Sequence, residues 1–219
     1  MKILLVAATL SELKPIQEKL DEELDEHEIF SLITGVGMIA TTFELTRTLM
    51  VERFDLAINA GIAGAFDKTI ELGEVVEVIQ DQFSEELIED GVALRSYHEI
   101  GLRDENEPPF YYGVLKRSFT FVQRSLDEAA LPFKEVRAIT VNKVHGNDFS
   151  IHRIKERLNP QVESMEGAAF FYVCSQMDIP TLQIRAISNY VEKRNPEAWK
   201  IELALNNLAE AISTIINKL

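Results

Sequence analysis

Short, continuous apolar runs recur along this chain and are the feature that most restricts its fold. Residues 3–8 form a continuous run, residues 181–187 form a mostly apolar one, and residues 55–60 are expected to be a further strand. Such runs are typical of strands that are buried on both faces of a sheet. Between them, apolar residues recur at helical spacing, as over residues 38–52. Strands that alternate with helices predict an α/β fold with a central mixed sheet flanked by helices.

The length of the chain favours a single domain over residues 1–219. A chain of 219 residues with 46% hydrophobic and 26% charged residues is long enough to bury one large core. Ser11 is expected to cap the first helix, with Glu12 in its first turn. The other expected elements are strands at residues 28–33, 73–79 and 136–141, a loop-rich excursion at 84–109, a helix at 116–130 and an amphipathic helix at 196–219.

The stretch from residue 162 to residue 190 holds the clearest candidate site. Glu166 lies at the start of an apolar helix, where the helix dipole favours negative charge, and small residues follow it at positions 167–169. The next apolar run ends in the polar pair Ser188 and Asn189. Polar groups at the carboxyl end of a buried strand are how open α/β sheets present a ligand site. Taken singly, Glu166 also fits an ordinary helix carboxylate, and the polar pair an ordinary turn.

Polar or small residues follow the other predicted strands as well. Because the carboxyl ends of parallel strands meet at one edge of a sheet, these residues are expected to converge on one site. They are Glu12 after the first strand, Gly35 and Gly37 after the second, residues 61–64 after the third, Asp148 and Phe149 after the strand near residue 140, and Asn189 after the last. The glycine pair is neither a dinucleotide-binding nor a Walker loop, and it also fits a plain connection from strand to helix.

The charge of the chain argues against several classes of partner. A net charge of -14 repels phosphate backbones and anionic lipid, which disfavours nucleic acid and membrane partners. The one cysteine, Cys174, lies in an apolar helical run and is expected to be a buried, inert thiol. No run has the pattern of a signal peptide or the length of a membrane span. The four histidines lack metal-ligand spacing. We therefore expect a soluble, cytoplasmic protein without a metal site.

Several short motifs, taken in order, resemble those of a known family. The segments are AATLSEL, ITGVGMIAT, NAGIAGAFD with LGEVV, HGNDFS, ESMEGAAF and RAISNY. Over almost the whole chain they resemble the purine nucleoside phosphorylase and nucleosidase superfamily. Within it, the chain is similar to the 5′-methylthioadenosine/S-adenosylhomocysteine nucleosidases, and closer still to the futalosine hydrolases. The resemblance implies a partly barrel-like sheet, a homo-oligomer, commonly a dimer, and cleavage of an N-ribosidic bond by water without metal or organic cofactor.

The resemblance also implies roles for individual residues. Glu12 matches the carboxylate that activates the attacking water, and Glu166 matches the residue that holds the ribose hydroxyls. Phe149 matches the aromatic side chain that stacks on the base, while Ser188 and Asn189 match the pair that reaches the purine. The further substrate-binding positions implied in the same way are Met165, Ile62, Ala63, Gly64 and Gly37.

Asn189 separates this chain from the methylthioadenosine branch, which has aspartate at that position. A protonated aspartate can donate to N7 of adenine. Asparagine can donate its NH2 group to O6 of a 6-oxopurine, but it cannot supply a proton. Hypoxanthine is therefore the expected leaving base, with the N7 proton coming from water, and the resemblance implies futalosine as the substrate. An anionic Glu12 would repel phosphate, which favours hydrolysis over phosphorolysis.

Two alternative functions stay open. The chain also fits another purine nucleosidase, including a 5′-methylthioadenosine/S-adenosylhomocysteine nucleosidase. It fits a non-catalytic nucleoside-binding protein too, which would need Glu166 and Phe149 but not Glu12. The neighbouring acids expected to be structural or solvated are Asp67, Asp148 and Glu163. The groups that could meet a carboxylate on the 5′ side of the sugar are Arg95, His98, Arg103 or a residue of a partner subunit.

Overall fold

The central sheet of the protein closes on itself. The computed structural model describes residues 1–21, 27–118 and 131–219. Its main sheet contains β1 (Lys2–Ala7), β2 (Glu28–Ile33), β3 (Leu56–Ala65), β4 (Val75–Asp81), β7 (Leu115–Lys116), β8 (Lys134–Thr140), β9 (Val162–Ser164) and β10 (Thr181–Tyr190). β3 pairs with both β10 and β9, β10 pairs with β4, β4 with β8, and β8 with β9. These pairings close a ring of strands, as the predicted barrel-like sheet requires.

The strand directions in this sheet are mixed. β1 runs parallel to β2 and β3, and β3 runs parallel to β10, so β2, β1, β3 and β10 form a parallel layer. β4 is antiparallel to β10, and β9 is antiparallel to β3. The predicted α/β class with a mixed sheet is therefore confirmed.

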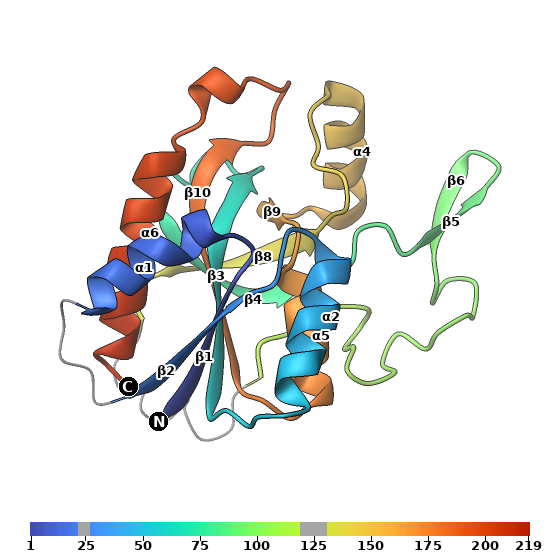
Figure 1. The fold of residues 1–219 in the computed structure, drawn as a ribbon. Coiled ribbons are helices and arrows are strands. Elements are labelled where there is room, and N and C mark those ends of the chain that lie inside the picture. Colours follow the sequence, from blue (N-terminus) through green and yellow to red (C-terminus); the bar gives the residue numbers. More distant parts are fainter. Residues whose placement is uncertain (22–26, 119–130) are drawn as a thin grey trace.

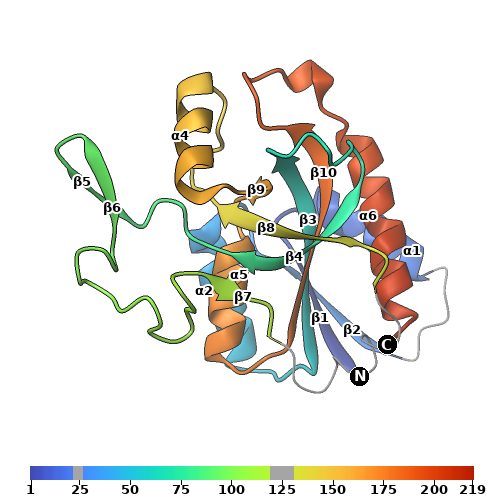
Figure 2. The ribbon, with the colours of Figure 1, turned by 180° about the vertical axis from the view of Figure 1, so that it is seen from behind.

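Helices cover both faces of the sheet. On one side, α1 (Leu10–Asp21) packs against α6 (Ile201–Ile216), over an apolar cluster that includes Ile58 and Ile212. On the other side, α2 (Met38–Leu49) packs against α5 (Gly167–Gln176), over a cluster that includes Leu45 and Phe170. Figures 1 and 2 show the two pairs on opposite sides of the strands, with α4 (Asp148–Leu158) beyond the layer of α5. The continuous apolar runs thus form strands that are buried on both faces.

Some elements differ from the sequence-based expectation. β3 continues to Ala65, five residues beyond the predicted end, and β10 continues through the polar pair to Tyr190. The loop-rich excursion contains a hairpin of β5 (Leu87–Asp90) and β6 (Ala93–Ser96). The predicted helix at 116–130 falls largely outside the described residues, and its first residue belongs to β7. The C-terminal helix is preceded by a separate 3-10 turn, η1 (Pro196–Ala198).

The structure bears on the environment of Cys174 and on membrane-spanning helices. Cys174 is fully buried in α5, and burial raises the pKa of its thiol, as expected for an inert cysteine. Within residues 1–21, 27–118 and 131–219, no helix has the length and apolar character that a bilayer crossing requires.

Candidate active site

Glu12 is held at the start of α1 by a capping box. The Oγ1 atom of Thr9 accepts a hydrogen bond from the Glu12 backbone N–H at 3.3 Å. In return, Glu12 Oε2 accepts from the Thr9 backbone N–H at 3.0 Å and from Thr9 Oγ1 at 2.9 Å. Thr9 is therefore the N-cap, and the prediction of Ser11 was wrong, because Ser11 lies inside the first helical turn.

The second oxygen of Glu12 reaches across to β3. Glu12 Oε1 accepts from the backbone N–H of Ile62 at 3.1 Å, and the residue is only 7% exposed. A carboxylate that accepts bonds from two elements at once has a fixed position and orientation. The side chain is thus anchored at the junction of α1 and β3, as a group that must aim at one reacting atom requires.

Glu166 is the second buried carboxylate, at the start of α5. It is the residue just before the helix, not a member of its first turn, and it is 6% exposed. Its Oε1 atom accepts from the backbone N–H of Gly37 at 3.0 Å, where α2 begins. Burial raises the pKa of the Glu166 carboxyl, the Arg185 guanidinium opposes that rise, and the charge of Glu12 adds to it. Glu12 and Glu166 are therefore within electrostatic reach of each other.

Arg185 is a buried cation that lies near both carboxylates. Its Nη1 atom is 3.8 Å from Glu166 Oε2, and its side chain is 1% exposed. A Cβ atom on Gly61 would overlap Arg185 Nη1 and would lie 2.9 Å from Glu12 Oε1. Only glycine at this position lets the guanidinium and the Glu12 carboxylate approach each other over β3. Sequence reasoning missed Arg185, although a single cation inside the apolar run of residues 181–187 was a visible signal.

A network of hydrogen bonds between buried polar side chains holds Arg185. Arg185 Nε donates to Gln183 Oε1 at 3.1 Å, and its Nη2 donates to Asn59 Oδ1. Gln183 Nε2 in turn donates to Asp81 Oδ2 at 3.2 Å. Asp81 is fully buried and also accepts from Thr140 Oγ1 at 3.0 Å. Every member of this chain has a partner, so the network fixes the guanidinium in one orientation.

Asn189 lies beside this centre, at the end of β10. A bulge after Ile187 shifts the pairing so that Asn189 stands opposite Gly64 of β3. Ser188 Oγ donates to Asn189 Oδ1 at 2.8 Å, and it also lies 3.3 Å from the carbonyl oxygen of Ala63. Asn189 Nδ2 donates to the carbonyl oxygen of Tyr190 at 3.1 Å. Ser188 and Asn189 therefore have hydrogen-bond partners. Residues 62–64, predicted to lie beside base and sugar, are on the neighbouring strand β3.

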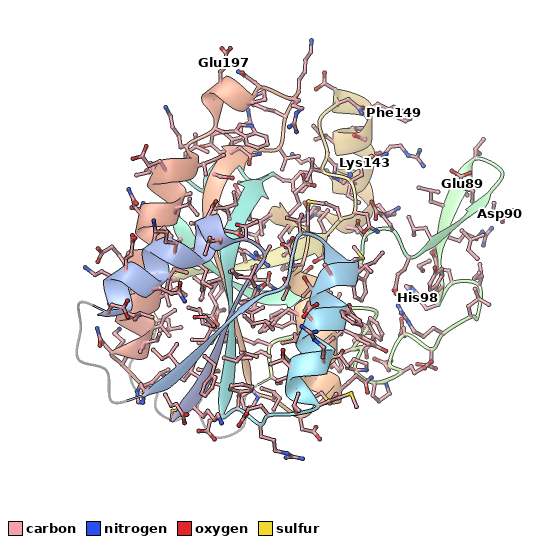
Figure 3. The ribbon with its side chains drawn as sticks, in the orientation of Figure 1. Glu89, Asp90, His98, Lys143, Phe149 and Glu197 are labelled. Atoms are coloured by element: carbon pink, nitrogen blue, oxygen red, sulfur yellow. The ribbon has the colours of Figure 1, made fainter. Side chains whose placement is uncertain are left out.

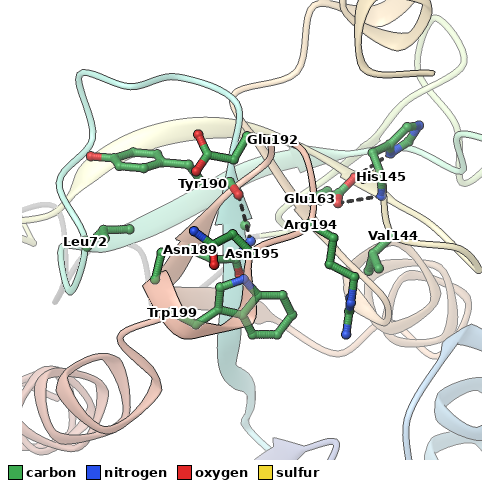
Figure 4. A pocket seen from close by; sticks show the side chains of 12 residues that line it. Leu72, Val144, His145, Glu163, Asn189, Tyr190, Glu192, Arg194, Asn195 and Trp199 are labelled. Carbon is green, nitrogen blue, oxygen red and sulfur yellow. Dashed lines mark hydrogen bonds and ion pairs between the residues drawn. The ribbon is translucent and has the colours of Figure 1, made fainter. Parts of the chain in front are cut away.

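A cavity opens next to Asn189, as Figure 4 shows. The residues around it include Gly64, His145, Glu163, Asn189, Arg194 and Trp199. Gly64 lies two residues beyond Ile62, whose N–H binds Glu12. Two residues along a strand span about 7 Å and return to the same face. The cavity therefore opens about 7 Å along β3 from the residue whose N–H binds Glu12.

Comparison with known proteins agrees with this geometry. The sequence profile of the phosphorylase superfamily matches residues 16–219. The chain belongs to the phosphorylase superfamily. The 5′-methylthioadenosine/S-adenosylhomocysteine nucleosidase of Listeria monocytogenes is 32% identical over 184 residues, which are 76% of this chain and 71% of that protein. The futalosine hydrolase of Thermus thermophilus is 24% identical over 191 residues, which are 84% of this chain and 80% of that protein.

Solved structures show the same superfamily fold. The 5′-methylthioadenosine/S-adenosylhomocysteine nucleosidase of Neisseria meningitidis, in complex with methylthio-immucillin-A, superposes with a TM-score of 0.81 at 17% identity. The superposition covers 100% of this chain and 99% of that one. The expectation of an enzyme is confirmed at the level of the superfamily, since these relatives are named as nucleosidases and a hydrolase.

Phe149 is the predicted site residue that the structure does not bring to the others. It lies in the first turn of α4, is 71% exposed, and points outward in Figure 3. The side chain of Asn147 accepts from the backbone N–H of Ser150 at 3.0 Å, which starts the helix in this orientation. Arg153 covers the ring at 5.5 Å. Met165 is partly buried against the apolar cluster around Ile154, next to Glu166 in the chain. Stacking by Phe149 therefore stays a prediction that requires movement of the loop before α4.

Asp81 makes the unfolding free energy depend on pH in an unusual direction. Burial raises its pKa from 3.8 to about 7. The folded protein then retains a proton that the unfolded chain releases, so this contribution is fully present below the unfolded pKa and is lost as pH rises through the folded value. The expected loss is up to about 1.4 kcal/mol per pH unit within that window.

Urea unfolding of Asp81→Asn at a series of pH values measures this contribution. The stability of the variant relative to wild type is expected to rise between pH 4 and pH 7, because the asparagine does not titrate. Asp90→Asn in the exposed β5–β6 hairpin is the control, with a constant difference expected. A constant difference for Asp81→Asn as well would show that Asp81 does not titrate in this range.

Proposed function

We propose that this protein is a purine nucleosidase that hydrolyses the N-ribosidic bond of futalosine. The products would be hypoxanthine and dehypoxanthine futalosine, in the futalosine pathway of menaquinone biosynthesis. The observation that carries the proposal is the pair of buried carboxylates, Glu12 and Glu166, with the buried Arg185 near both. Relatives named as futalosine hydrolase and as 5′-methylthioadenosine/S-adenosylhomocysteine nucleosidase both support a nucleosidase.

The chemistry of ribosyl cleavage explains the need for two carboxylates. As the base leaves, C1′ becomes cationic and the base takes the bonding electrons. Glu12 removes a proton from the water that attacks C1′, which is the work of a general base. Glu166 accepts hydrogen bonds from the 2′ and 3′ hydroxyls and favours the developing positive charge more than the neutral ground state.

Arg185 is proposed to stabilise the two carboxylates electrostatically. Its guanidinium opposes the burial that raises the pKa of Glu166, and it lies beside Glu12 over Gly61. A cation near both carboxylates reduces their mutual repulsion and favours the ionised form of Glu166. Phe149, Met165 and residues 62–64 complete the proposed contacts to base and sugar.

Asn189 supports a 6-oxopurine as the leaving base. Its Oδ1 already accepts from Ser188, and its NH2 group can donate to a carbonyl oxygen such as O6. An adenine would present its 6-amino group there, which is a donor facing a donor. The alternative of a 5′-methylthioadenosine/S-adenosylhomocysteine nucleosidase is favoured by the larger number of relatives with that name, and substrate turnover decides between the two.

Asn189→Asp is expected to shift the substrate preference. The carboxyl can be protonated and donate to N7 of adenine, so turnover of methylthioadenosine relative to futalosine should rise at least about tenfold, or 1.4 kcal/mol. Initial rates of adenine and hypoxanthine release measure the ratio. Asn195→Asp adds the same charge elsewhere in the cavity and should leave the ratio unchanged. A wild-type enzyme that cleaves methylthioadenosine fastest would contradict the proposed substrate.

We further propose a single domain over residues 1–219, a cytoplasmic location, and a homodimer or higher homo-oligomer. The outer face of α2 supports the oligomer, because Ile39, Phe43 and Met50 are 81%, 62% and 76% exposed. Together with Phe83 they line one hollow with little polar surface. Contiguous apolar side chains of this kind mark protein interfaces. Sedimentation measurements of the purified protein give the subunit number.

A further inference from the structure

Cleavage of a purine nucleoside requires a proton that Asn189 cannot supply. The departing base carries the electron pair of the broken C1′–N9 bond, and protonation at N7 makes it a far better leaving group. The amide of Asn189 can hydrogen-bond to the base, but it has no proton to transfer at neutral pH. An acid elsewhere in the cavity would remove this difficulty.

The sheet places one acidic side chain in the required position. In the register of the ring, Gly64 of β3 pairs with Asn189 of β10 on one side and with Glu163 of β9 on the other. Directly paired residues project their side chains to the same face of a sheet. A Cβ atom on Gly64 would lie 3.1 Å from Asn189 Nδ2 and 3.7 Å from Glu163 Cγ. The space over Gly64 is therefore bounded by the Val191 methyl, which a Cβ would approach to 3.0 Å, by the Asn189 amide and by the Glu163 side chain.

Glu163 is tightly paired with a group that can share a proton. His145 Nδ1 lies 2.6 Å from Glu163 Oε2, and the His145 backbone N–H donates to Glu163 Oε1 at 3.0 Å. The two side chains are 13% and 5% exposed, and both line the Asn189 cavity, as Figure 4 shows. Phe66 packs edge-on against the His145 ring at 5.9 Å. The expectation that Glu163 is merely structural or solvated does not account for its place in this cavity.

We propose that the Glu163–His145 pair delivers the proton to the leaving base. This proposal rests on the proposed nucleosidase function. A base whose N7–O6 edge faces Gly64 would receive a hydrogen bond at O6 from Asn189 and a proton at N7 from Glu163. The C1′–N9 bond breaks with its electrons passing to the base, water adds to C1′, and Glu12 takes the proton that this water loses.

The proton balance of the cycle closes without a further reactant. Glu163 gives up one proton and Glu12 gains one, and exchange with solvent restores both groups after the products leave. His145 holds the shared proton against Glu163 and orients the carboxyl group, so it acts as a positioning residue and as the route of reprotonation. General acid catalysis of this kind contributes about 10²–10⁴-fold to the rate.

Two substrates separate a proton donor from a structural pair. Futalosine or inosine needs a proton on the leaving base, whereas 4-nitrophenyl β-D-ribofuranoside releases a stable anion and needs none. Glu163→Gln preserves the size of the side chain and can still accept from His145. We expect kcat for the purine nucleoside to fall at least about 100-fold, with the rate for the nitrophenyl riboside changed less than about threefold. Glu156→Gln, whose carboxylate pairs with His152 at 3.2 Å on the exposed side of α4, is the control and should leave both rates unchanged.

Parallel loss on both substrates, or loss on neither, would overturn the proposal. The thermal unfolding midpoint of Glu163→Gln is measured alongside, and if that variant does not fold, His145→Gln is put to the same two substrates. In a second experiment, Asn189→Asp is combined with Glu163→Gln. An acid at position 189 should raise the rate on methylthioadenosine at least about tenfold above the rate of Glu163→Gln alone. No restoration in the folded double variant counts against the proposal. A wild-type protein that cleaves neither class of riboside would contradict the nucleosidase function itself, which is a distinguishable result.

Discussion

Replacing Glu12 by glutamine is expected to lower kcat for nucleoside cleavage by about 10²–10⁴-fold, while the substrate still binds. Glutamine has the same length and can still accept a hydrogen bond from Thr9 or from the backbone N–H of Ile62. It cannot take a proton from water at neutral pH. Steady-state release of the base measures the loss, and titration calorimetry with the intact nucleoside measures the retained affinity.

The same variant separates an enzyme from a nucleoside-binding protein. A binding protein has no use for a base that activates water, so Glu12→Gln would leave its only measurable property unchanged. Glu18→Gln is a matched control on the exposed side of α1, where the carboxylate pairs with Lys14. Equal turnover by Glu12→Gln and Glu18→Gln would show that Glu12 is not the general base.

Removing the buried cation is expected to have the largest effect on stability. Arg185→Met should lower the unfolding free energy at pH 8 by about 3–5 kcal/mol, since methionine fills much of the space but leaves buried carboxylates without a positive partner. Arg185 opposes the rise in the pKa of both Glu166 and Asp81. The loss should therefore shrink as pH falls and the two carboxyls take up protons. Urea unfolding at pH 8 and pH 5 measures both quantities.

Two further variants test the assignment of that loss to charge. Arg137→Met removes a guanidinium from an exposed position of β8 and should change stability by less than about 0.5 kcal/mol. Adding Glu166→Gln to Arg185→Met removes one of the unpaired carboxylates and should recover part of the stability at pH 8. A loss that is independent of pH and unaffected by Glu166→Gln would indicate lost packing instead.

The layered fold could be predicted because it follows from local patterns. The expected strands at residues 3–8, 55–60 and 181–187 correspond to β1, β3 and β10, and the helical periodicities correspond to α1, α2, α5 and α6. Closure of the ring was expected only from the resemblance. It depends on β9, a strand of three residues that pairs with β3 and β8, and so short a strand leaves little trace in sequence periodicity.

The candidate site was predictable where residues follow strand ends. Glu12 and Gly37 follow β1 and β2 and contact Ile62 and Glu166, because carboxyl ends of neighbouring parallel strands meet there, whereas residues 62–64 lie inside β3 and not after it. Arg185 and Asp81 were missed because each lies in a strand, and only the folded register shows that their side chains join through Gln183. The sequence likewise could not show that Glu163 and Asn189 both pair with Gly64, because β9 and β10 are far apart in the chain.

Release of free base with and without inorganic phosphate tests the central claim most directly. The claim is that Glu12 and Glu166 act across one sugar, the first activating water and the second holding the ribose. Purified protein incubated with futalosine, inosine and methylthioadenosine should release hypoxanthine from futalosine fastest, with a free sugar product and a rate that phosphate does not change. Absence of base release from every nucleoside, or release that requires phosphate and yields a sugar 1-phosphate, would contradict it.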